Sequence, residues 1–129
     1  MPALPPPPAE AAWMTDVIGA EATLLLVERR GGQAMYIPHE VNQASPLAQL
    51  LGLDAARALA GSYGGEHRKI PLLRWWRVRV EKARGLTDRA IAAKLVMTED
   101  HVSRLLRARA PAPASTPAKP TSQLSLFGQ

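Results

Sequence analysis

"RRGGQAMYIP", residues 29–38, holds the two short signals that decide the fold, a glycine pair and an Ile-Pro pair. Both pairs return 33 positions later in "SYGGEHRKIP", residues 62–71. The match extends backwards, because "VIGAEA" at residues 17–22 aligns with "LLGLDA" at residues 50–55 at the same offset. This shared spacing indicates an internal duplication.

Each copy of the repeat predicts the same series of elements. In the first copy, residues 13–18 and 20–30 are expected to form two helices separated by Gly19. A short strand is expected over residues 34–37, because the glycine pair permits the positive φ that ends a helix and the proline ends the strand. The second copy repeats this plan between residues 46 and 70.

The two copies also lead to an expectation about assembly. Ser45 and Pro46 open the second copy, and they suit the N-cap and the first turn of a helix. Two copies are too few for a solenoid, and two such short strands are marginal as an isolated sheet. We therefore expect residues 12–70 to form a dimerisation domain that completes its core against a second copy of the chain.

Charge divides the chain into an acidic and a basic half. Residues 1–56 carry two basic and six acidic side chains, a net charge of −4, whereas residues 57–109 carry thirteen and five, a net charge of +8. Such asymmetry favours contact between the second half and a polyanion, of which nucleic acid is the commonest. A solvated basic face without a partner is the alternative.

Length and composition limit the classes of protein that the chain can belong to. A chain of 129 residues is one small domain or two very small ones, and the absence of cysteine excludes disulfides and thiolate metal sites. The first residues lack the features of a secretory signal, and no apolar run is long enough for a membrane span, so we expect a cytoplasmic protein. The Pro- and Ala-rich residues 1–11 predict disorder, and residues 110–122 predict a flexible linker.

A basic helix is expected to follow the second copy, in "PLLRWWRVRVEKARG", residues 71–85. Pro71 is expected to begin the helix and Gly85 to end it. Helical spacing places Leu73, Trp76, Val80 and Ala83 on one apolar face, with Arg74, Arg77, Lys82 and Arg84 away from it. The tryptophans could stack on single-stranded nucleic acid, but the position of Trp76 favours core packing.

Residues 86–107, "LTDRAIAAKLVMTEDHVSRLLR", have the pattern of a helix-turn-helix. Thr87 can cap a helix that ends near Leu95, and Thr98 can cap a second helix. The apolar contacts of the motif fall on Ile91, Leu95, Met97, Val102 and Leu105, and Ala92 is the small residue that lets the helices approach. Val96 departs from the pattern, because this position of the turn usually carries glycine in a left-handed conformation. We therefore expect a turn that differs in detail.

The second helix of the motif is expected to enter the major groove of DNA. Ser103 and Arg104 are candidates for base edges, and Arg107 or Arg109 for a phosphate. Glu99 and Asp100 could accept from cytosine amino groups or could only stabilise the helix N-terminus, and both alternatives stay open. The predicted DNA-binding residues are Arg74, Arg77, Arg89, Thr98, Glu99, Asp100, His101, Ser103, Arg104 and Arg107.

Residues 14–109 resemble the Mor transcription activators, the middle-operon regulators of transposable phages. The resemblance rests on "VIGAEATLLLVERRGGQAMYIP", "PLAQLLGLDAARALAGSYGGE", "IPL" and the terminal helix-turn-helix. It implies an intertwined homodimer that binds an inverted-repeat promoter element and recruits RNA polymerase. The expected fold is mainly α with short β-strands: an N-terminal α/β dimerisation region, then a helix-turn-helix DNA-binding domain over residues 71–109.

The segment "QLSLFGQ", residues 123–129, follows the linker and resembles the peptide by which bacterial replication and repair proteins bind the DNA polymerase sliding clamp. In that peptide, apolar side chains fill a pocket and a glutamine hydrogen-bonds at its rim. The predicted clamp-binding residues are Gln123, Leu124, Leu126 and Phe127. The alternative is that this apolar tail packs on its own domain.

Three classes of function are suggested by these patterns. The first is a sequence-specific transcription regulator, a phage or prophage activator that binds double-stranded DNA as a homodimer. The second is a DNA-binding adaptor that the sliding clamp recruits. An enzyme is not expected, because His39, His67 and His101 are scattered and neither a nucleophile–base pattern nor a phosphate loop is present. Metal-ligand spacing is absent too, so no metal or other cofactor is expected.

Overall fold

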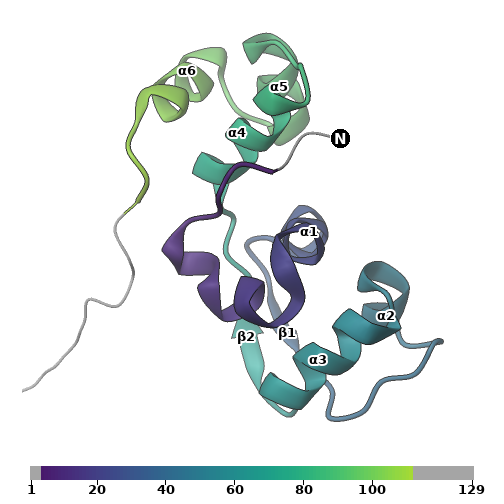
Figure 1. Cartoon of the computed structure of the whole chain (residues 1–129). Coiled ribbons are helices and arrows are strands. Elements are labelled where there is room, and N and C mark those ends of the chain that lie inside the picture. The colour runs from purple at the N-terminus through teal and green to yellow at the C-terminus, as the bar shows by residue number, and fades with distance from the viewer. Residues whose placement is uncertain (1–3, 112–129) are drawn as a thin grey trace, which may run out of the picture.

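The computed structural model describes residues 4–111 and has the expected architecture, mainly α-helical with one small sheet (Figure 1). One group of elements contains the two copies of the repeat, and the other contains the three C-terminal helices. In chain order the elements are η1 (Ala9–Ala11), α1 (Ala12–Arg30), β1 (Ala34–Tyr36), α2 (Pro46–Leu51), α3 (Leu53–Tyr63), β2 (His67–Lys69), α4 (Arg74–Ala83), α5 (Asp88–Leu95) and α6 (Glu99–Arg107). No helix within residues 4–111 has the length and apolar character to cross a bilayer.

The backbone repeats with the sequence. Gly19 interrupts α1 with φ 83° and ψ 167°, and Gly52 separates α2 from α3 with φ 91° and ψ 154°. Of the glycine pairs, Gly31 has φ −54° and ψ 134°, and its counterpart Gly64 has φ −55° and ψ 136°. The second glycine of each pair has a positive φ, as a helix exit of this kind requires. The two copies therefore have the same backbone conformation at these glycines.

The two strands pair with each other within one chain. They are antiparallel, with Met35 opposite Arg68 at the centre of the register. The ends of the ladder match as well, because Gly32 N–H donates to the Ile70 carbonyl at 2.7 Å and Gly65 N–H donates to the Ile37 carbonyl at 2.7 Å. The copies are therefore related by an approximate twofold axis, and each completes the core of the other. The homodimer stays a prediction.

Residues 4–11 correct the expectation that residues 1–11 are disordered. The segment runs beside α4 in Figure 1, where Trp76 Nε1–H donates to the Pro5 carbonyl at 2.7 Å. Pro8 is buried. Ala11 is fully buried in the larger apolar cluster, to which α1, α2, α3 and α4 contribute and which we call the main core. A proline-rich segment loses little conformational freedom when it becomes ordered, so a few contacts are enough to fix it.

Helix α4 corrects the expectation that the basic helix begins at Pro71, because it starts at Arg74. Leu73 precedes it in a left-handed conformation, with φ 51° and ψ 41°, and its side chain is buried in the main core. Trp76 and Val80 pack in that core as expected, whereas Ala83 is exposed. Val78 lies in a second cluster with α5 and α6, so α4 joins both parts of the molecule.

Candidate nucleic-acid interface

Helices α5 and α6 form the predicted helix-turn-helix and pack with α4 around one apolar cluster. Thr87 Oγ1 accepts from Ala90 N–H at 3.1 Å, and Thr98 Oγ1 accepts from His101 N–H at 3.1 Å, so both expected N-caps form. Ala92 is buried where the helices meet. The cluster consists of Val78, Ile91, Ala92, Leu95 and Val102, with Leu86, Met97, Leu105 and Leu106 packed against it.

The turn between α5 and α6 takes the usual form in spite of its valine. Val96 has φ 57° and ψ 59°, and its side chain is 88% exposed. The Met97 N–H donates to the Ala92 carbonyl at 2.8 Å, which closes the end of α5. The expectation of a different turn is therefore wrong. The left-handed conformation costs a non-glycine residue about 1–2 kcal/mol, and the packing of the two helices offsets this cost.

The outward face of α6 carries exposed charged side chains. Glu99, Asp100, Arg104 and Arg107 are all exposed. Arg104 Nε lies 3.7 Å from Asp100 Oδ2, one helical turn away, with both side chains largely in solvent. An exposed pair of this kind contributes little stability, so Arg104 is free to exchange Asp100 for another acceptor.

Ser103 lies on the same helix but is bonded within the protein. Its hydroxyl donates to Asp88 Oδ2 at 3.1 Å, and Lys82 Nζ donates to Asp88 Oδ1 at 2.7 Å. Both bonds lower the pKa of the Asp88 carboxyl, and the bond from Lys82 has the larger effect. A serine has one O–H donor, so the hydroxyl of Ser103 keeps only its acceptor capacity for a base edge.

The remaining predicted residues lie in different places. Arg89 is exposed on the first turn of α5, whereas His101 is half-buried and Thr98 serves as the cap of α6. Arg77 is half-buried in α4; burial lowers its pKa, while the charges of Glu28 and Glu81 raise it. Arg77 is therefore half-buried and within the electrostatic influence of Glu28 and Glu81. Arg74, at the start of α4, lines a groove that is separate from the outward face of α6.

A buried carboxylate that sequence reasoning missed holds α4, α5 and α1 together. The side chain of Glu81 is 1% exposed, and its Oε2 lies 3.0 Å from Lys94 Nζ and 3.1 Å from Arg84 Nη1. Arg84 also lies 3.5 Å from Glu28 of α1. The sequence offered one signal for this role, because Glu81 is the single acidic residue in the basic helix segment 71–85. Glu81 is buried, whereas Lys94 and Arg84 are partly exposed, so the loss of either cation would leave a buried carboxylate with fewer partners. This network links the helix-turn-helix to its scaffold.

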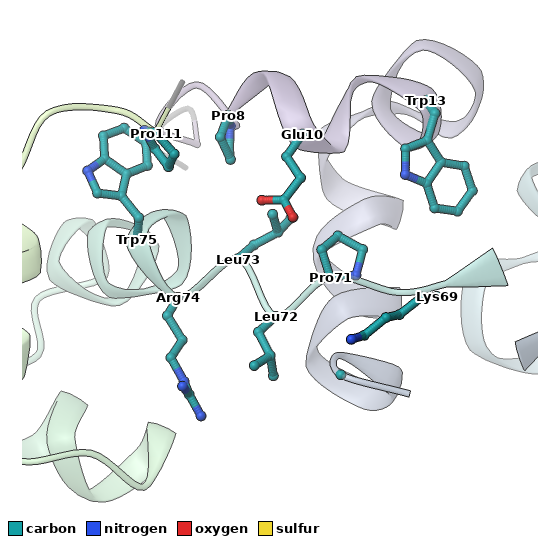
Figure 2. Close-up of a pocket in the computed structure, with 11 residues that line it drawn as sticks. Pro8, Glu10, Trp13, Lys69, Pro71, Leu72, Leu73, Arg74, Trp75 and Pro111 are labelled. Carbon is teal, nitrogen blue, oxygen red and sulfur yellow. The ribbon is translucent and has the colours of Figure 1, made fainter. Parts of the chain in front are cut away.

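The groove beside α4 has a volume of about 690 Å³ (Figure 2). Trp75 and Trp13 lie at its opposite ends, and the Glu10 carboxylate points towards Leu73. No residue of α6 lines it. Within residues 4–111, no group of three or more His, Cys, Asp or Glu side chains could hold a metal ion. The three histidines, His39, His67 and His101, come from separate segments, and none of them lines the groove.

The predicted clamp-binding residues Gln123, Leu124, Leu126 and Phe127 lie outside the described part of the chain. Comparisons of the chain with protein-family models, with curated proteins and with solved structures found no match. The arrangement of α4, α5 and α6 is therefore the basis on which a function can be argued.

Proposed function

We propose that this protein is a sequence-specific transcription regulator that binds double-stranded DNA through α6. One observation carries the proposal: a capped helix-turn-helix presents an exposed charged helix from the half of the chain that has a net charge of +8. The other helices of the unit are fixed by the apolar cluster and by the ion pairs of Glu81. The presented helix therefore has a defined orientation before it meets DNA.

The exposed side chains of α6 have different roles in this proposal. Arg104 reads a guanine through O6 and N7, a contact that supplies about 1–3 kcal/mol of discrimination. Arg107, one turn further on, binds a phosphate. Ser103 accepts from a base amino group, because its proton is held by Asp88. For Glu99 and Asp100, base contact and stabilisation of the helix N-terminus remain the two alternatives.

The proposed assembly is a homodimer on an inverted-repeat element. The described part of each chain contains one helix of the α6 type, so an inverted repeat needs two chains. The resemblance to the Mor activators supports this assembly and a role as a phage or prophage activator that recruits RNA polymerase. The chain itself supplies the scaffold, because its two copies already form one core.

A salt-dependent binding titration tests the proposal. The purified protein would be titrated with DNA from upstream of its neighbouring operons and with a scrambled sequence of equal length. Strong preference for one inverted repeat, lost in Arg104→Ala, is the expected result. Arg57→Ala is the matched control, because Arg57 is an exposed arginine on α3, among the repeats. Equal, steeply salt-dependent binding to both DNAs would contradict sequence-specific regulation.

The second candidate is an adaptor that the sliding clamp recruits, and the sequence of residues 123–127 favours it. A chain that lacks residues 123–129 should then lose binding to the clamp while it keeps binding to DNA. Clamp binding that survives the deletion would exclude this candidate. Binding to DNA without sequence preference, together with clamp binding that the deletion abolishes, would favour it over the regulator.

A further inference from the structure

The side chain of Arg79 binds four backbone carbonyl groups. From the middle of α4, its Nη1 donates to the carbonyls of Trp75 at 3.1 Å and Leu105 at 2.8 Å. Its Nη2 donates to the carbonyls of Leu106 at 3.0 Å and Ala108 at 2.8 Å. Three of these four acceptors belong to the end of α6 and the residue after it. One arginine thus joins the middle of α4 to the end of the candidate recognition helix.

Trp75 completes this contact, which we call the Arg79 clasp: Arg79, Trp75 and the carbonyls of Leu105, Leu106 and Ala108. The guanidinium carbon of Arg79 lies 3.9 Å from the centre of the Trp75 ring, in cation–π geometry. Trp75 Nε1–H donates to the Ala108 carbonyl at 3.0 Å. The indole therefore fixes the plane of the guanidinium and binds the same carbonyl group.

The clasp takes the place of a helix cap. The last carbonyl groups of an α-helix have no hydrogen-bond partners within the helix. A turn with a left-handed glycine after the helix often supplies these partners through its N–H groups. Directly after α6 the position of such a glycine is taken by Ala108, which is extended, with φ −77° and ψ 151°. A positive charge at a helix C-terminus is favourable as well. Arg79 provides both the donors and the charge from a different helix, so it fixes the position of α6 as well as its end.

The geometry of the clasp also excludes the more usual role of an arginine in a DNA-binding protein. A guanidinium has five N–H donors. The two nitrogens Nη1 and Nη2 each make two hydrogen bonds to carbonyl groups, which uses all four of their protons. Only Nε–H remains, so Arg79 has no pair of donors for a phosphate or a guanine.

We propose that Arg79 is a positioning residue that does not touch DNA. It sets the angle at which α6 enters the major groove, and this angle determines how well the protein discriminates between sequences. This inference rests on the proposed function. It predicts that loss of the clasp weakens binding to the specific sequence more than binding to unrelated DNA. It also predicts that the salt dependence of binding to unrelated DNA is unchanged, because Arg79 itself makes no phosphate contact.

The experiment compares the full chain with Arg79→Ala, Arg79→Lys and the control Arg57→Ala. Hydrogen exchange at the amides of residues 105–108 reports on the clasp without DNA. In Arg79→Ala, we expect exchange there to rise about tenfold, as for a lost cation at a helix C-terminus, with α1 and α3 unchanged. We expect the ratio of specific to non-specific affinity to fall about tenfold, the effect of one misplaced base contact.

Arg79→Lys separates geometry from charge. A lysine keeps the positive charge, but its single nitrogen cannot reach four carbonyl groups. It should therefore restore little of the discrimination. Full rescue by lysine, or a salt slope that falls by about one in Arg79→Ala, would overturn the proposal in favour of a simple charge or phosphate contact. Unchanged exchange and unchanged discrimination would also overturn it.

These readouts keep the inference distinct from the proposed function. If the wild-type chain shows no sequence preference, the proposed function fails and Arg79 has no discrimination to set. The hydrogen exchange would still show whether Arg79 fixes the end of α6. If the wild-type chain is sequence-specific and Arg79→Ala keeps that specificity, only the inference about Arg79 fails.

Discussion

The two copies of the repeat have nearly the same backbone, but their surroundings differ at the glycine pairs. A side chain at Gly64 would place its Cβ 2.4 Å from the Ala60 carbonyl, 3.0 Å from the Cα of His39 and 3.2 Å from the Pro38 carbonyl. At Gly31, the corresponding distances are 2.6 Å to the Val27 carbonyl and 3.4 Å to the Pro71 carbonyl. In each copy, the helix exit thus contacts the residues that follow the strand of the other copy.

In both copies, the glycine that ends the helix contacts the proline that follows the strand of the other copy. The copies differ in the segment that comes after this proline. The shared contact is present twice because it holds the copies together. Beyond the strands, Pro38 leads to a loop and α2, whereas Pro71 leads to α4 and the helix-turn-helix. The same kind of helix end is therefore followed by a loop in one copy and by the helix-turn-helix unit in the other.

Gly64→Ala should destabilise the folded chain more than Gly31→Ala. The added methyl group meets backbone atoms that cannot move independently, and overpacking of this kind costs up to about 3 kcal/mol. We expect about 3 kcal/mol for Gly64→Ala and about 2 kcal/mol for Gly31→Ala, because the second site is less crowded. Urea unfolding of both variants measures the difference. Equal costs would show that the two exits are interchangeable.

Gly19→Ala and Gly52→Ala should cost the same amount. Both glycines adopt a conformation that only glycine takes readily, and a Cβ at either position would meet no atom within 4 Å. The cost is therefore backbone strain alone, about 2 kcal/mol at each site. Thermal or urea unfolding would test this equality. Costs that differ by more than about 1 kcal/mol would mean that the kinks of the copies are not equivalent.

Val96→Gly should stabilise the helix-turn-helix, whereas Leu73→Gly should destabilise the chain. Both residues are left-handed, but Val96 is exposed and Leu73 is buried. Glycine at position 96 relieves about 1–2 kcal/mol of backbone strain, but it costs about 0.5–1 kcal/mol because glycine loses more conformational entropy on folding. We therefore expect the free energy of unfolding to rise by about 0.5–1 kcal/mol for Val96→Gly. At Leu73, the loss of buried apolar surface outweighs this gain. Unfolding free energies that change in the same direction would contradict this comparison.

The smallest effect concerns pH and Asp88. Its pKa is lowered in the folded chain from the ordinary value of 3.8, by hydrogen bonds from Lys82 and then from Ser103. The stabilisation is therefore fully present above about pH 3.8 and is lost as the pH falls through the lower pKa of the folded state. Asp88→Asn should remove this part of the pH dependence, measured as the difference between the unfolding curves of the two proteins. A difference that stays constant from about pH 5 to about pH 2 would contradict the assignment.

Local signals in the sequence predicted much of the fold and the helix-turn-helix. The glycine pairs, the caps Thr87 and Thr98 and the apolar spacing of α5 and α6 each act over a few residues, so they can be recognised without a structure. The partner of each strand could not be predicted in this way, because pairing within a chain and between chains satisfies the same pattern. The ordering of residues 4–11 was missed for a similar reason, since it depends on Trp76, which is distant in sequence.

The residues that fix α6 were missed because their roles depend on contacts between distant positions. Arg79 resembles its neighbouring arginines in sequence, and only the fold brings it to the end of α6. Glu81 has charged partners at the residue after α4 and on α5 that no periodic pattern indicates. For Arg77, the helical spacing indicated a charge but not its burial, which lowers the pKa of its guanidinium against the opposing effect of Glu28 and Glu81.

The covalent link between the paired copies has a consequence for dilution. In a symmetric pair of separate chains, the partner concentration falls when the protein is diluted, and every substitution is made twice. Here the pairing of β1 with β2 is unimolecular, so its equilibrium is independent of protein concentration. Each copy can also be changed alone, which lets one surface evolve without altering its counterpart. Any concentration dependence of unfolding would therefore come from a contact other than this sheet.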